Sequence, residues 1–151
     1  MDPENEAELL AELPTPTVDS APFWEGCNAE SLLLQRCGEC RHLFYFARRL
    51  CPACGATELT WESSTGRGTI YSFSEVHVAF QGPDWNSQIP YTVILVDLDE
   101  GPRMLSRWLA PEGSSLPAIG DQVRVTFPAI NGQKLPFFTA LSSKGNDRDT
   151  G

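Results

Sequence analysis

Two Cys-x-x-Cys pairs carry most of the chemistry that this sequence offers, Cys37 with Cys40 and Cys51 with Cys54. Each pair can form a tight knuckle that directs two sulfurs at one point, and two knuckles on the arms of a hairpin place four thiolates in a tetrahedron. Zn²⁺ suits such a set because it favours soft ligands and has no redox chemistry. The spacing therefore predicts a zinc ribbon.

Two other interpretations of these cysteines compete with metal binding. A thioredoxin-like redox motif uses one Cys-x-x-Cys beside a βαβ pattern, and a pair of disulfides is typical of secreted proteins. The sequence shows neither context. Four protein thiolates fill the coordination shell of the ion, so we expect a structural Zn²⁺ with no open position for water or substrate.

Few other side chains are candidates for catalysis. The chain has two histidines, His42 and His77, and a fifth cysteine, Cys27, without an evident partner or activating base. We interpret Cys27 as a buried free thiol and His42 as a surface or hydrogen-bonding side chain. Because no nucleophile–base pair is evident, we predict no catalytic residue and no enzyme activity of the chain on its own.

Length and charge narrow the class of protein. The 151 residues suit one ordinary domain or two small modules that share an interface. Acidic residues outnumber basic ones by 20 to 11, and the formal net charge of -9 argues against a nucleic-acid surface. No apolar run reaches the ~18 residues that span a bilayer, and no signal-peptide pattern is visible. We therefore expect a cytoplasmic protein without membrane contact.

The elements that position the cysteines come before and around them. A helix is expected to begin near residues 19–22, where Asp19 or Ser20 can cap the free N–H groups and Pro22 is tolerated in the first turn. Strands are expected at residues 31–36, 43–46 and 58–62, and the last of these alternates polar and apolar residues.

The second half of the chain reads as all β. Gly66 and Gly68 mark the passage into it, because glycines permit a sharp change of chain direction. The long strand at 69–78 changes its apolar phase near Ser74, which indicates a bulge. A helical loop region is expected around 110–119, and Asn131-Gly132 predicts a hairpin. Further strands are expected at residues 91–98, 103–109, 122–127 and 135–141.

Five strands, the first one long and bent, fit an OB-type barrel. The predicted architecture is mainly β, with an N-terminal helix and a rubredoxin-like zinc ribbon over residues 19–65, followed by a five-stranded OB-fold barrel over residues 66–142. Residues 1–18 are predicted to be a flexible N-terminal segment and residues 143–151 a disordered tail.

Several short motifs together resemble a known family. They are residues 22–26 (PFWEG), 34–37 (LQRC), 50–55 (LCPACG) and 66–73 (GRGTIYSF). This combination resembles the zinc-ribbon and OB-fold family once catalogued as domain of unknown function 35, over about residues 15 to 141. The resemblance implies an accessory subunit that binds acyl-CoA and assembles with a thiolase-superfamily enzyme, sometimes with a hydratase. It implies roles in thiolase, acyl-transfer or retro-aldol reactions, including those on steroid side chains.

Four side chains are candidates to contact a partner or CoA. Arg48 and Arg49 offer guanidinium groups to an acidic rim or a CoA phosphate. Phe80 and Trp85 lie in a stretch with turn chemistry, so we expect them at the surface as interface anchors. The alternative function is a single-stranded nucleic-acid-binding module, since ribbons and OB folds both serve that use and bases stack on aromatics. The scarcity of lysine and arginine argues against it.

Overall fold

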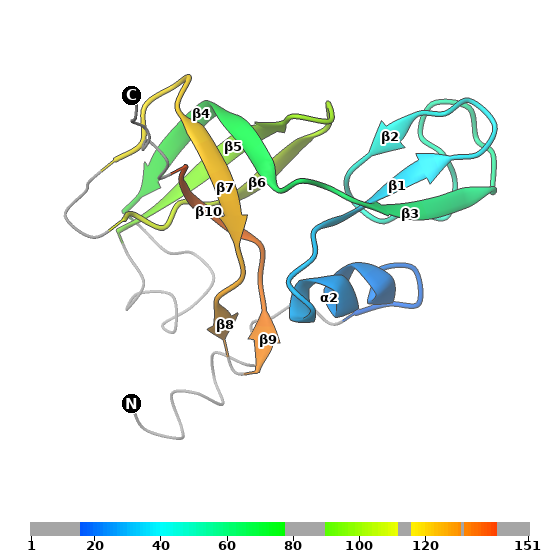
Figure 1. Cartoon of the computed structure of the whole chain (residues 1–151), viewed down its shortest axis with the longest axis horizontal. Helices are drawn as coiled ribbons and strands as arrows, with labels where there is room; N and C mark the ends of the chain where they lie inside the picture. The colour runs from blue at the N-terminus through cyan, green and yellow to red at the C-terminus, as the bar shows by residue number, and fades with distance from the viewer. Residues whose placement is uncertain (1–15, 78–89, 112–115, 131, 142–151) are drawn as a thin grey trace, which may run out of the picture.

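The computed structural model describes residues 16–77, 90–111, 116–130 and 132–141. Within these ranges the chain forms one helix, α2 (Ala21–Asn28), and ten strands. Figure 1 shows three of the strands and the helix at one end of the molecule and the remaining strands at the other. The prediction of a mainly β protein is confirmed.

The first three strands form the ribbon. They are β1 (Leu33–Cys37), β2 (Leu43–Phe44) and β3 (Leu59–Ser63), all antiparallel, in the order β2-β1-β3. β1 and β3 lie within two residues of the predicted strands. β2 is shorter than the predicted 43–46 because Phe46 has φ +85°, outside the region that a strand requires.

Helix α2 begins where the sequence predicts, at Ala21 with Pro22 in its first turn. The expected side-chain cap is not formed. The hydroxyl of Ser20 instead accepts a hydrogen bond from the N–H of Thr17, at 2.9 Å. On the inner face Cys27 is fully buried, and burial raises the pKa of its thiol to about 12, which confirms a protonated, buried cysteine.

The barrel is a five-stranded antiparallel sheet in the order β10-β7-β4-β5-β6. A parallel bridge between Trp108 and Phe138 joins the two outer strands, and the N–H of Leu109 donates to the Phe138 carbonyl at 2.8 Å. This closure confirms the predicted OB-type barrel. Its strands are β4 (Arg67–Val76), β5 (Tyr91–Leu98), β6 (Arg103–Arg107), β7 (Gln122–Thr126) and β10 (Phe137–Ala140).

The bulge in β4 lies three residues before the predicted position. The pairing with β5 shifts between Ile70 and Ser72, so Tyr71 is the extra residue. Ile70 is buried and Phe73 packs against the core, whereas Tyr71 is 49% exposed. A regular strand would place Tyr71 and Phe73 on one face, and the bulge separates them.

The connections differ in how well the sequence predicts them. A two-stranded hairpin, β8 (Ala129–Ile130) with β9 (Gln133–Lys134), confirms the Asn-Gly signal, and Gly132 has φ +88°. In the predicted helical region, the described residues 110–111 and 116–119 contain no helix. There the carboxylate of Asp121 accepts a hydrogen bond from the N–H of Ala118 at 2.9 Å and fixes a turn instead.

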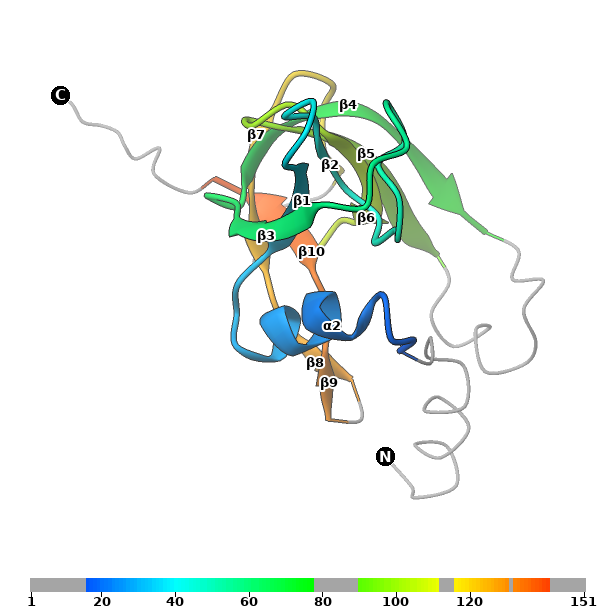
Figure 2. The same ribbon diagram turned by 90° about the vertical axis from the view of Figure 1, so that its right-hand side faces the viewer.

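One hydrophobic core joins the helix, the ribbon and the barrel. Figure 2 shows α2 and the ribbon in front of the barrel, and α2 packs against β1 and β9. Within the described residues, no helix is long and apolar enough to cross a membrane. The buried residues of the core are Phe23, Cys27, Leu32, Leu34, Ile70, Ile94, Val96, Leu98, Met104, Trp108, Val123 and Phe138.

The proposed boundary between residues 65 and 66 lies at a tight junction. Gly66 has φ +81°, and a Cβ there would lie 2.5 Å from Cγ1 of Val125. The Glu100 carboxylate accepts hydrogen bonds from the Thr65 N–H at 2.7 Å and the Ser64 hydroxyl at 2.9 Å. Burial works to raise the pKa of Glu100, but these hydrogen bonds prevail and lower it.

Candidate metal centre and arginine cleft

The ribbon brings four sulfurs to one point. The Sγ atoms of Cys37, Cys40, Cys51 and Cys54 all lie within 4.8 Å of one another. The pairs Cys37–Cys54 and Cys40–Cys51 are each separated by 3.6 Å. A tetrahedral zinc site with Zn–S bonds of about 2.3 Å has sulfur–sulfur edges of about 3.8 Å. The four thiols therefore fit a tetrahedral metal site.

Backbone N–H groups point at two of the four sulfurs. The N–H groups of Cys40 and Glu39 point to the Cys37 sulfur, at 3.4 and 3.3 Å, and the Ala53 N–H points to the Cys51 sulfur at 3.3 Å. Hydrogen bonding from Cys40, aided by Glu39, lowers the pKa of Cys37 to about 7. The thiolate is the form that binds metal, so these N–H groups favour the ligand state of the Cys37 sulfur.

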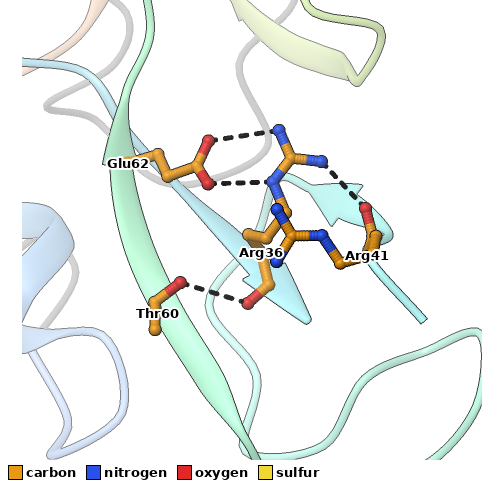
Figure 3. Close-up of polar contacts among 4 residues, drawn as sticks. All are labelled: Arg36, Arg41, Thr60 and Glu62. Carbon is orange, nitrogen blue, oxygen red and sulfur yellow. Dashed lines mark hydrogen bonds and ion pairs between the residues drawn. The ribbon is translucent and has the colours of Figure 1, made fainter. Parts of the chain in front are cut away.

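An ion pair ties the first knuckle to β3. Figure 3 shows Arg36 held by both carboxylate oxygens of Glu62, with N–O distances of 2.8 and 3.2 Å. A further guanidinium nitrogen of Arg36 donates to the Arg41 carbonyl at 2.8 Å. Arg41 has φ +68°, which is unfavourable for a side chain of its size, and this bond stabilises that conformation. Sequence reasoning missed this ion pair, although the opposite charges of Arg36 and Glu62 on two predicted strands were a signal for it.

The surroundings of the sulfurs are apolar, and His42 is not among the ligands. Phe44 is buried beside Cys37 and Cys51, with Leu59 packed against them. His42 is exposed, and its ring stacks on Phe44 with centroids 5.7 Å apart. The interpretation of His42 as a surface side chain is confirmed.

The two candidate arginines lie at one cleft of about 590 Å³ between the start of α2 and the ribbon. The cleft walls are partly apolar, and Arg49 Nε lies 3.9 Å from an Asp19 carboxylate oxygen. The other two predicted contacts, Phe80 and Trp85, lie outside the described residues. The lining residues other than these arginines are Val18, Asp19, Pro22, Gln35, Leu50, Thr57, Leu59 and Trp61.

A buried glutamine fixes the position of Arg48. Gln35 is 5% exposed, and its amide makes two hydrogen bonds with the main chain of Arg48. Its Nε2 donates to the Arg48 carbonyl at 3.0 Å, and its Oε1 accepts from the Arg48 N–H at 2.8 Å. Sequence reasoning missed Gln35, because a polar residue in a strand gives no sign of a partner 13 positions away.

Comparison with known proteins agrees with this architecture. Residues 24–60 match the family model described as the ChsH2 rubredoxin-like zinc ribbon domain, and residues 61–128 match the model of the ChsH2 C-terminal OB-fold domain. A chain of the solved structure titled "Ltp2-ChsH2(DUF35) aldolase" superposes with a TM-score of 0.71 and 28% identity. The match covers 85% of this chain and 98% of that chain.

Two curated relatives extend the comparison. The 3-oxo-4,17-pregnadiene-20-carboxyl-CoA hydratase alpha subunit of Mycobacterium tuberculosis is 34% identical over 76% of this chain, which spans only 35% of that subunit's length. A DUF35 domain-containing scaffold protein of Methanothermobacter thermautotrophicus is 30% identical over 63% of this chain and 70% of its own length. The chain therefore belongs to the DUF35 family of scaffold proteins, with a zinc ribbon followed by an OB-fold domain.

Proposed function

We propose that this protein is a non-catalytic accessory subunit that assembles with a thiolase-superfamily enzyme and helps to bind acyl-CoA. The observation that carries the proposal is the match to nearly the whole length of a chain in the Ltp2-ChsH2(DUF35) aldolase. Because that chain has the same ribbon and barrel, the match supports a similar place in an enzyme complex. A hydratase is a further candidate partner, since one relative is named as a hydratase subunit.

The metal centre supports a structural rather than a catalytic role. A Zn²⁺ ion held by all four cysteines has no open position, so it cannot activate water or polarise a carbonyl. The candidate catalytic side chains Cys27 and His77 are also poorly placed for catalysis. Cys27 is buried with a raised pKa, and His77 is exposed with its Nε2 3.4 Å from Glu75. We therefore assign turnover to the partner.

The arginine cleft supports a contact to CoA or to the enzyme. Arg48 and Arg49 are exposed at its rim, and guanidinium groups bind phosphates and carboxylates with charge-assisted hydrogen bonds. We propose these two residues, with Phe80 and Trp85, as contacts to the partner or to CoA. Thiolase, acyl-transfer and retro-aldol reactions in the cytoplasm, on lipid or steroid thioesters, are the candidate chemistries.

The alternative, binding of single-stranded nucleic acid, has less support from the barrel. OB folds commonly bind oligonucleotides on the face of their second and third strands, which here are β5 and β6. On β6, Arg103 is held by Asp97 at 2.6 Å and stacks on Tyr71 at 3.4 Å, so its charge is already paired. A salt titration against single-stranded DNA tests this alternative, which predicts tight binding with a steep salt slope.

Two measurements test the main proposal. Co-purification of the full chain from its native cells, followed by mass spectrometry, should identify a thiolase-like enzyme as partner. The purified chain alone should turn over no acyl-CoA thioester, whereas the reconstituted complex should. Turnover by the chain alone that a point mutation within it abolishes would refute the accessory role.

A further inference from the structure

The loop Phe46–Leu50, which precedes the second knuckle, projects apolar side chains into solvent. Phe46 is 65% exposed and Leu50 is 51% exposed. Phe46 also has φ +85°, a conformation that bulky residues rarely adopt. Strained backbone of this kind persists only when the surrounding structure holds it, and it is concentrated at functional sites.

The surrounding structure holds this loop just before its first residue and at its middle. Before it, the ring of Tyr45 packs against Phe23 with centroids 5.7 Å apart, and Tyr45 contacts the common core. Within it, the buried amide of Gln35 binds both the N–H and the carbonyl of Arg48. The turn at Phe46 therefore directs one aromatic ring inward and the next one outward. The loop is prepared in a fixed conformation.

The same loop presents positive charge. Within the described residues, the guanidinium of Arg48 makes no hydrogen bond or ion pair, although the main chain of Arg48 is fixed by Gln35. Arg49 is 81% exposed, and its contact with Asp19, at 3.9 Å, is long. In a chain with a formal net charge of -9, this is a local cationic site beside exposed apolar groups.

We infer that the loop Phe46–Leu50 is a docking element for an acidic surface of the partner enzyme that has an apolar pocket at its centre. Aromatic and arginine side chains are the residues that most often dominate binding energy at protein interfaces. A rigid loop loses little entropy on binding, and the two arginines require opposite charge on the partner. The inference rests on the proposed function, because it needs an enzyme as partner.

Two substitutions separate docking from folding. Phe46→Gly removes the ring but suits the positive φ, so the variant should melt at or above the temperature of the wild type. Arg48→Glu reverses the charge and keeps the main-chain bonds to Gln35. With zinc-loaded full chain and the purified partner enzyme, each substitution should raise Kd at least tenfold. The matched controls Ile119→Gly, which removes a side chain that is 69% exposed, and Arg124→Glu, at an exposed barrel arginine, should bind like the wild type.

The outcomes are distinguishable. Wild-type affinity of both loop variants would overturn the docking role and leave the accessory function standing, whereas failure of the wild-type chain to bind any thiolase-like enzyme would overturn the accessory function itself. If Arg48→Glu weakened binding of free CoA or of single-stranded DNA but not of the enzyme, the loop would belong to that ligand and the inference would be wrong. Tenfold weaker enzyme binding by both loop variants, with unchanged controls, supports it, whereas an effect of only one variant would overturn the combined apolar and charged contact.

Discussion

Replacing Gln35 by methionine tests whether one buried amide holds the loop Phe46–Leu50 in place. Methionine is close to glutamine in size, so the change removes two hydrogen bonds to Arg48 with little change in packing. Each bond contributes about 1 kcal/mol net, and the freed N–H and carbonyl of Arg48 can partly bind water because the site is only part-buried. We therefore expect a loss of about 2 kcal/mol, a large fraction of the 5–15 kcal/mol that is typical of a domain.

Hydrogen exchange of the Arg48 amide is the direct assay. A loss of about 2 kcal/mol in local opening corresponds to exchange about 30-fold faster at this amide. The metal content should stay at one ion per chain, since all four cysteines are untouched. Gln122→Met, at an exposed glutamine of β7, is the control and should leave exchange at Arg48 unchanged. Unaltered protection of Arg48 in the Gln35 variant would refute the reasoning.

Three further predictions concern the metal, the junction and acid stability. Cys40→Ser should abolish stoichiometric zinc binding and unfold the ribbon, whereas Cys27→Ser should keep its metal; elemental analysis with circular dichroism checks both. Gly66→Ala should destabilise the protein by about 2 kcal/mol or more in urea unfolding, because the added Cβ meets Val125 at 2.5 Å and the φ is positive. Glu100→Gln should be less stable than the wild type at pH 7. Because folding lowers the pKa of this carboxyl, its contribution is present above the unfolded pKa, so the difference should vanish as the pH falls through the lowered value.

The parts of the fold that could be predicted depend on local patterns. The Cys-x-x-Cys spacing and the nearly continuous apolar run from Tyr91 to Leu98 each act within a few residues, and β5 has the predicted bounds. The bulge at Tyr71 depends on the pairing of β4 with β5, which no single stretch encodes. Likewise, the role of Gln35 follows from the path of a loop that comes later in the chain. The predicted interface contacts of Phe80 and Trp85 stay predictions, because both residues lie outside the described part of the chain.

The common core couples metal binding in the ribbon to folding of the barrel. Leu32 and Leu34 of the ribbon lie in the same buried cluster as Val96 and Phe138 of the barrel, so one part cannot unfold without exposing apolar surface of the other. An ion that binds only the folded state stabilises that state by mass action. A metal at the four cysteines therefore also acts as a folding ligand for the barrel, some distance from its own site. The concentration of free zinc at synthesis would then set how much of the chain reaches the folded state.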